Sequence, residues 1–276
     1  MNSKPVNFGL IIIGDEILSG KRADKHMPKG IELLKARGLQ LAYADYVGDL
    51  RERITATLAR AFASGDVVFS CGGIGATPDD HTRQCAGAAL GVPLVLHPRA
   101  EALIRERMQD TAREQGVPYE PDRADNIHRL NMGMFPQGSE IIPNPYNKIP
   151  GFTCKGQGNG AVHFVPGFPV MAWPMIEWVL DTHYAHLFCK AAWIEKSVIV
   201  FGAMEATLTP LMEDIERGHE GVKVFSLPSV DHPEYGRHIE LGVKGEPGAV
   251  DAAYASLLLG LQAFTAKLGP ELVRKY

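Results

Sequence analysis

The feature that most restricts the possible folds is the apolar run at residues 8–13. Phe8–Ile13 contains no polar side chain, and half of its residues are isoleucine. An unbroken run of this length is typical of a parallel strand that helices cover on both faces, because a half-exposed strand alternates apolar and polar residues. It is also too short to span a membrane. The sequence therefore predicts a buried central strand.

The segments after this run alternate between helical and strand patterns. Asp24 stands where an N-cap belongs, and Gly38 follows the expected end of the first helix. We expect strands at 39–47, 66–70, 149–154 and 161–165, and helices at 25–37, 51–63, 82–90, 99–115 and 170–188. This alternation predicts an α/β fold, a three-layer α/β/α domain with a mostly parallel sheet.

A smaller α/β pattern follows near the end of the sequence. We expect strands at 194–201, 222–227 and 238–243, and helices at 205–217 and 250–267. The segment has no glycine-rich loop and no acidic cluster, so we expect it to serve packing or assembly. The predicted boundary separates a domain of residues 1–188 from a small α/β sandwich of residues 189–276.

Composition narrows the class of protein. The formal net charge is -4 and no run of five basic residues occurs, so nucleic-acid binding is not expected. Hydrophobic residues make up 45% and charged residues 22%, which are ordinary globular values, and no membrane segment is expected. The cysteines, Cys71, Cys85, Cys154 and Cys189, form no closely spaced pair, which argues against a zinc site or a disulfide framework. We therefore expect a cytoplasmic protein.

Glycine is densest at Cys71–Thr82, between a predicted strand and the predicted helix 82–90. Backbone N–H groups at the start of a helix attract an anion. Glycine lets the main chain approach a phosphate because it has no Cβ, and the Thr77 hydroxyl can add a donor. In open α/β sheets, ligands usually bind at such strand ends. The sequence therefore predicts a phosphate site in this loop.

Acidic residues accompany the loop. Asp79 and Asp80 lie within it, and others stand at probable strand ends: Asp15, Glu16, Asp24 and Asp49. Carboxylates that face a phosphate repel it unless a divalent cation lies between them. We therefore expect Mg²⁺ or a similar cation, with Asp15, Asp24, Asp79 and Asp80 as its candidate ligands. Such an ion can polarise a phosphoryl oxygen or activate a bound water.

Five motifs in order resemble those of the MoaB/Mog molybdopterin-binding domain. They are Gly14–Gly20, Asp24, Val47–Asp49, Gly72–Thr82 and Val165–Pro169. The first motif, Gly-Asp-Glu-Ile-Leu-Ser-Gly, and the end of the glycine loop, Thr-Pro-Asp-Asp-His-Thr, are most similar to the N-terminal region of CinA-type proteins. The small second domain is similar to the linker domain of those proteins, so the resemblance covers most of the sequence. We expect no counterpart of their C-terminal deamidase domain.

The resemblance implies a small-molecule ligand, molybdopterin or a related phosphorylated pterin or nucleotide. It implies that this ligand is bound by Gly14, Ser19, Gly72, Gly73, Ile74, Gly75, Thr77, Pro166 and Gly167. In the Mog branch, residues matching Asp49 and Asp80 serve the adenylylation of molybdopterin, and these two are the candidate catalytic residues. In the CinA branch the implied activity is a metal-dependent pyrophosphatase acting on ADP-ribose. The resemblance also implies a homo-oligomer, a dimer or trimer.

Alternatives stay open at this point. The functional hypotheses are ligand binding without turnover, hydrolysis of a dinucleotide such as ADP-ribose and, ranked last, molybdopterin adenylylation. Several aspartates have a structural interpretation, since helix caps belong at Asp24, Asp49, Asp79 and Asp80, and Asp15 fits a turn. His183 and His186 share a helix face but lack an evident third metal ligand. Cys71 is expected to be a packed thiol.

Overall fold

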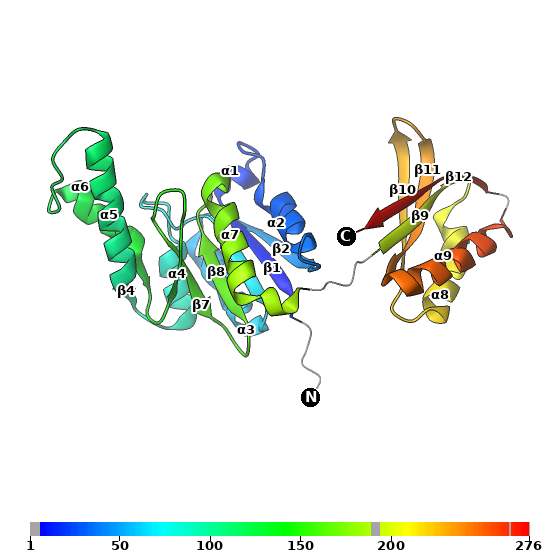
Figure 1. Ribbon diagram of the computed structural model, residues 1–276, viewed down its shortest axis with the longest axis horizontal. Helices are drawn as coiled ribbons and strands as arrows, with labels where there is room; N and C mark the ends of the chain where they lie inside the picture. The colour runs from blue at the N-terminus through cyan, green and yellow to red at the C-terminus, as the bar shows by residue number, and fades with distance from the viewer. Residues whose placement is uncertain (1–5, 189–193, 265, 276) are drawn as a thin grey trace. The chain divides into compact units, whose positions relative to one another are not determined.

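The computed structural model describes residues 6–188, 194–264 and 266–275. Two compact units divide the chain at Phe188 (Figure 1). Cys189, where the second domain is expected to begin, lies outside the described residues. Among the residues described, no helix combines the length and the apolar character needed to cross a membrane.

A six-stranded sheet with the order β2-β1-β3-β8-β7-β6 forms the centre of the first unit. Its parallel part consists of β2 (Leu41–Val47), β1 (Phe8–Ile13), β3 (Val67–Cys71) and β8 (Ala161–Val165). β7 (Gly151–Lys155) pairs antiparallel with both β8 and β6 (Glu140–Ile142). All of β1 is buried, which confirms the predicted central strand.

Helices cover both faces of this sheet (Figure 1). α2 (His26–Lys35) and α7 (Pro169–His183) pack on one face, and α3 (Arg51–Ser64) and α4 (Thr82–Leu90) pack on the other. Side chains of β1 alternate between the two cores, because successive residues of a strand point to opposite faces. Leu10 and Ile12 join the α2–α7 side, whereas Ile11 and Ile13 join the α3–α4 side. The predicted three-layer α/β/α architecture is confirmed.

Further elements complete the first unit. They are α1 (Asp15–Leu18), β4 (Leu94–Leu96), α5 (Pro98–Glu114), α6 (Ala124–Arg129), β5 (Met134–Pro136) and the 3₁₀ helices η1 (Leu130–Gly133) and η2 (Ala185–Leu187). β4 and β5 form a separate antiparallel pair. Of these elements only α5 was expected from the sequence, because three-residue strands and one-turn helices carry too few residues to show a period.

The second unit is an antiparallel sheet with two helices. Its elements are β9 (Ile194–Phe201), α8 (Glu205–Gly218), β10 (Lys223–His232), β11 (Gly236–Gly245), α9 (Pro247–Leu261) and β12 (Lys267–Lys275), with strand order β10-β11-β9-β12. The predicted helix 250–267 is wrong at its end, since α9 stops at Leu261 and a strand follows. No strand was predicted at 267–275, where Gly269 and Pro270 are residues that seldom occur inside a strand. β12 tolerates this proline because it is an edge strand.

Candidate functional site

The glycine-rich loop joins β3 to α4 at the carboxyl end of the parallel strands. Gly72 and Gly73 have φ values of 110° and 68°, a region that other residues rarely adopt. A Cβ on Gly72 would collide with the Ile13 carbonyl oxygen, and one on Gly73 with the Thr82 hydroxyl. The Gly72 N–H donates to the Val165 carbonyl over 3.0 Å, and the Thr82 N–H donates to the Gly73 carbonyl over 3.0 Å. This close approach is possible only without side chains.

The loop borders a cavity of about 540 Å³, hereafter the main cavity. The backbone N–H groups of residues 73–76 find no acceptor among the described residues. Nearly all predicted ligand-binding residues line this cavity: Gly14, Gly72, Gly73, Ile74, Gly75, Thr77, Pro166 and Gly167. Ser19 is the exception, and it lies with Asp15 in a separate surface hollow. Unpaired N–H groups beside a cavity are donors that an anion can use.

Asp80 folds back on the loop. Its Oδ2 accepts hydrogen bonds from the Thr77 backbone N–H (2.8 Å) and hydroxyl (2.5 Å). It does not cap α4, whose N-cap residue is His81 and shows no side-chain cap bond. Asp79 is exposed, and hydrogen bonding from Thr77 lowers its pKa. Both aspartates line the main cavity, so the structure brings this acidic pair to the predicted phosphate loop.

Asp15 and Asp49 exchange hydrogen bonds across the ends of β1 and β2. The Asp15 N–H donates to Asp49 Oδ2 (2.9 Å), and the Asp49 N–H donates to Asp15 Oδ1 (3.2 Å). Asp49 does not cap α3, since Leu50 is the N-cap residue there. Burial raises the pKa of Asp49, the hydrogen bond from the Asp15 N–H lowers it, and the charges of Asp15, Glu16 and Asp79 raise it further, so that the net shift is upward. Asp49 lines the main cavity, whereas Asp15 does not.

Asp24 serves as the N-cap of α2. Its Oδ1 accepts from the His26 N–H (2.8 Å), and its Oδ2 accepts from the Met27 N–H (3.1 Å) and the Tyr46 hydroxyl (2.8 Å). The capping interpretation is confirmed, and Asp24 does not line the main cavity.

The predicted metal ligands are not gathered into one group. Among the residues that the structure describes, no cluster of three or more His, Cys, Asp or Glu side chains is arranged to hold a metal ion. Of the four candidates, only Asp79 and Asp80 line the main cavity, while Asp24 caps a helix and Asp15 faces the surface. The cation therefore stays a prediction.

Arg83 is a buried arginine that contacts the glycine loop. This α4 residue is 3% exposed, and its guanidinium donates to the Gly75 carbonyl (2.6 Å) and the Asn131 carbonyl (2.6 Å). A buried cation needs such partners, and burial lowers the pKa of Arg83. The residue thereby links the loop to η1. Nothing in the sequence pattern distinguished it from an exposed helix arginine.

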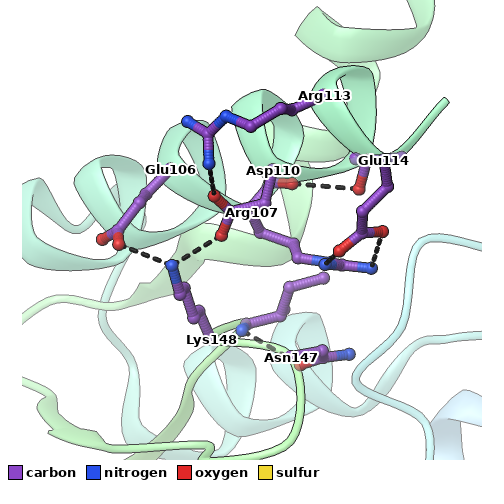
Figure 2. A network of polar contacts seen from close by, with 9 residues as sticks. Glu106, Arg107, Asp110, Arg113, Glu114, Asn147 and Lys148 are labelled. Atoms are coloured by element: carbon purple, nitrogen blue, oxygen red, sulfur yellow. Dashed lines mark hydrogen bonds and ion pairs between the residues drawn. The ribbon is translucent and has the colours of Figure 1, made fainter. Parts of the chain in front are cut away.

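The segment between β6 and β7 forms another wall of the main cavity, with Asn144 and Asn147 in its lining. Asn144 is buried, and its Nδ2 donates to Asn147 Oδ1 over 2.8 Å. Figure 2 shows how Lys148 fastens this segment to α5. The Lys148 Nζ contacts Glu106 (2.6 Å) and Asp110 (2.5 Å), and its backbone has the unusual φ of 65°. The contacts of Lys148 therefore connect this wall of the main cavity to α5.

Several lining residues were not among the ligand, metal or catalytic candidates from the sequence, although Glu16 was noted as an acid at a probable strand end. They are Ile13, Glu16, Arg22, Ala76, Met132, Asn144, Asn147, Ile149, Pro150, Phe168 and Met171. The Pro/Asn-rich character of residues 143–147 and the aromatic residue in the turn 165–169 were visible signals. Neither pattern shows which cavity a side chain lines, since that depends on long-range packing.

The remaining candidates keep their structural interpretation. Cys71 is fully buried, and burial followed by the charge of Asp24 raises its pKa, so the nucleophilic thiolate is strongly disfavoured. His183 lies near the buried His163, with ring centroids 6.5 Å apart, and His186 is exposed in η2. Neither belongs to a metal-binding group within the described part of the chain.

Comparison with known families gives one match that spans most of the first unit. A model described as a probable molybdopterin binding domain matches residues 9–186. A CinA-like protein of Anaeromyxobacter sp. (strain K) is 35% identical over 208 residues, covering 74% of this chain and 48% of the relative. The chain thus spans about half the length of that relative.

Two further similarities cover different shares of the chain. A protein of Pyrobaculum calidifontis is 29% identical over 255 residues, which is 90% of this chain and 93% of that protein. Among solved structures, the CinA protein of Thermoplasma acidophilum, described as of unknown function, aligns with a TM-score of 0.53 and 26% identity. That alignment covers 63% of this chain and 97% of the other.

Proposed function

Because the chain belongs to the family of probable molybdopterin binding domains, we propose that its first unit binds a phosphorylated pterin or nucleotide in the main cavity. The observation that carries this proposal is the row of unpaired N–H groups at residues 73–76 beside that cavity. A phosphoryl group placed there accepts several hydrogen bonds at once, as anions do in backbone nests. The glycines keep side chains out of its way.

The charge of the cavity makes a divalent cation part of the proposal. Glu16, Asp49, Asp79 and Asp80 line the main cavity, and Arg22 is the one basic residue among its described lining. A phosphate would be repelled unless a cation lay between it and these acids. Mg²⁺ needs only one or two carboxylates when substrate phosphates and waters supply the other ligands. Asp80 and Asp79 are the proposed protein ligands of the cation. Asp49 lies close enough to Asp79 for the charge of Asp79 to raise its pKa.

Calorimetry with AMP tests this binding. We expect AMP to bind in the presence of Mg²⁺ and to bind weakly in the presence of EDTA. Asp80→Asn should weaken binding at least about tenfold, or about 1.4 kcal/mol. The fold should survive, because an asparagine oxygen can still accept the hydrogen bonds from Thr77.

The matched control is Asp122→Asn, which removes the same charge from an exposed residue outside the main cavity. It should bind AMP as the unaltered protein does. If neither AMP nor molybdopterin bound with or without Mg²⁺, the proposed pocket would be wrong.

A second candidate function is hydrolysis of a nucleotide pyrophosphate such as ADP-ribose, and the raised pKa of Asp49 favours it. In this step a water oxygen attacks the adenosine-side phosphorus, the anhydride bond breaks and Asp49 accepts the proton of the water. The products are AMP and ribose 5-phosphate. Incubation with ADP-ribose and Mg²⁺, Mn²⁺ or Co²⁺ should release AMP, and the absence of AMP with every metal would leave ligand binding alone. Molybdopterin adenylylation ranks last, because the loop is more similar to the CinA branch.

A further inference from the structure

Asn147, in the wall of the main cavity between β6 and β7, has an amide donor that the protein leaves largely unused. The residue is half-buried, and its Oδ1 accepts hydrogen bonds from Asn144 Nδ2 (2.8 Å) and from the Ile149 N–H (3.1 Å). Its Nδ2 donates to Met171 Sδ (3.3 Å), the one acceptor it finds in the described part of the chain. A thioether is a weak acceptor, and an amide nitrogen carries two hydrogens. Asn147 and Met171 both line the main cavity, so the unused donor lies at its wall.

The bonds to its oxygen fix which way this amide faces. The Ile149 N–H bonds to a side chain two residues earlier, as in an Asx turn. A half-turn of the amide would set Nδ2 against two donors and lose both bonds. Asn144 cannot take its place as a donor, because its own Nδ2 already bonds to Asn147 Oδ1 and to the Ile149 carbonyl (2.9 Å). Of the two asparagines in this wall, Asn147 is therefore the one with a donor left for a ligand.

The backbone at Lys148 is strained, which points to a function for this segment. Its φ of 65° makes it the one residue other than glycine with a positive φ among those the structure describes. A Cβ is costly in this left-handed region, and strain of this kind gathers at functional sites. Lys148 follows Asn147 directly, and its Nζ contacts Glu106 (2.6 Å) and Asp110 (2.5 Å) of α5 (Figure 2). The two ion pairs therefore help to hold Asn147 in its place.

We propose that Asn147 is a further binding residue of the main cavity, which donates from Nδ2 to an oxygen atom of the ligand, and that Lys148 positions it. The proposal rests on the proposed function, since it needs a ligand in this cavity. A ligand oxygen is a much stronger acceptor than the Met171 sulfur. Binding therefore gains a hydrogen bond without breaking one to an oxygen, and the gain is largest if the oxygen is charged.

Asn147→Ser tests the donor. A serine hydroxyl can still accept the Ile149 N–H, as it does in an ST turn, but it is too short to replace Nδ2. We expect calorimetry to show that AMP binds at least about tenfold more weakly in the presence of Mg²⁺. Asn159→Ser is the matched control, because Asn159 is exposed in the turn between β7 and β8 and lies outside the main cavity. It should bind AMP as the unaltered protein does.

Pyrophosphate with Mg²⁺, titrated beside AMP, identifies the oxygen that Asn147 meets. A loss of affinity for both compounds in Asn147→Ser assigns the hydrogen bond to a phosphoryl oxygen. A loss for AMP alone assigns it to an oxygen of the nucleoside part. Either result supports Asn147 as a binding residue.

A double-mutant cycle separates positioning by Lys148 from a general effect on the fold. Lys148→Met removes both ion pairs and should weaken AMP binding about threefold, whereas Lys148→Arg, which can keep them, should bind nearly as the unaltered protein does. In an Asn147→Ser background, Lys148→Met should have no further effect, because a residue that acts through Asn147 then has nothing to position. Lys155→Met is the matched control, since its pair with Glu140 (3.2 Å) lies at the surface outside the main cavity.

A measurement on the unaltered protein does not depend on the folding of any variant. In ¹⁵N NMR spectra the side-chain amide resonances of Asn147 should shift when AMP and Mg²⁺ are added. Thermal melting followed by circular dichroism reports whether each variant is folded.

The outcomes are distinguishable. The proposal is overturned if folded Asn147→Ser binds AMP and pyrophosphate as tightly as the unaltered protein does, or if saturation with AMP leaves the Asn147 amide resonances unchanged. The positioning role of Lys148 is overturned if Lys148→Met weakens AMP binding equally in both backgrounds. These results would leave the proposed function intact. If the unaltered protein bound neither AMP nor pyrophosphate, the proposed function would fail and this inference would fail with it.

Discussion

Asp49 is held in an environment that disfavours its charge. Burial comes first, and the charges of Asp15, Glu16 and Asp79 add to it, so its pKa is raised above the ordinary 3.8. An acid whose pKa is higher in the folded state stabilises the fold below its unfolded-state pKa. That stabilisation is lost as the pH rises through the folded-state value. At neutral pH the Asp49 carboxylate is therefore a local cost to stability.

Asp49→Asn should raise the melting temperature at about pH 7 by a small amount, because the variant carries no charge there. The advantage should vanish at about pH 3, where the native carboxyl is protonated as well. Scanning calorimetry across this pH range measures the difference. An advantage that stayed the same at both ends of the range would show that ionisation is not its cause.

At the residue level the sequence predicted the loop better than the acids. The glycines of residues 72–75 could be predicted because strand, glycine loop and helix follow one another within the sequence. The sequence could not show which acidic residues line the cavity and which of them cap a helix. Asp24 proved to be a helix cap, and the carboxylates of Asp15 and Asp49 each accept the backbone N–H of the other residue. These roles depend on which strand ends lie side by side.

Arg83 of α4 connects the glycine loop to this helix by a hydrogen bond to the Gly75 carbonyl. Arg83→Met should remove both guanidinium bonds and leave the Gly75 and Asn131 carbonyls unpaired. Hydrogen bonds from a charged donor contribute roughly 1.5–3 kcal/mol, but water can partly replace the guanidinium because Gly75 is only half-buried and Asn131 is exposed, so we expect a loss of about 1–3 kcal/mol in the free energy of unfolding. Urea denaturation measures this loss, and AMP binding should weaken as well.

Arg113→Met is the matched control for this change. Arg113 is an exposed α5 residue that pairs with Asp110 at the surface, and such pairs contribute roughly 0–1 kcal/mol. An Arg83→Met variant as stable as this control would show that the buried guanidinium does not support the loop.

The elements of the first unit were predicted where their periods are long or their apolar runs unbroken. α4 and β8 agree with their expected ranges, and α3 differs by one residue at its end. β4 pairs with β5 across α5 and α6, and β6 pairs with β7 across the Pro/Asn-rich segment 143–150. Tertiary packing determines which of these short strands pair, so local patterns in the sequence could not reveal the pairing.

At the scale of the whole chain, all residues of the main cavity belong to the first unit. The second unit has its own core, which includes Val198, Leu241 and Leu257. A fragment of residues 1–188 should therefore bind AMP with an affinity within about threefold of the full chain, a difference of about 0.7 kcal/mol. Calorimetry on the fragment measures this affinity. A folded fragment that bound no AMP would show that the second unit, or an oligomer that it builds, completes the site.

The central claim is that residues 73–76 hold a phosphoryl group and that Asp79 and Asp80 share a cation with it. The most direct measurement is a crystal structure with AMP and Mn²⁺, in which anomalous scattering locates the metal. We predict phosphate oxygens within hydrogen-bond distance of these N–H groups and a manganese peak between the phosphate and the two aspartates. Phosphate density elsewhere, or a phosphate at the loop with no metal beside it, would contradict the account.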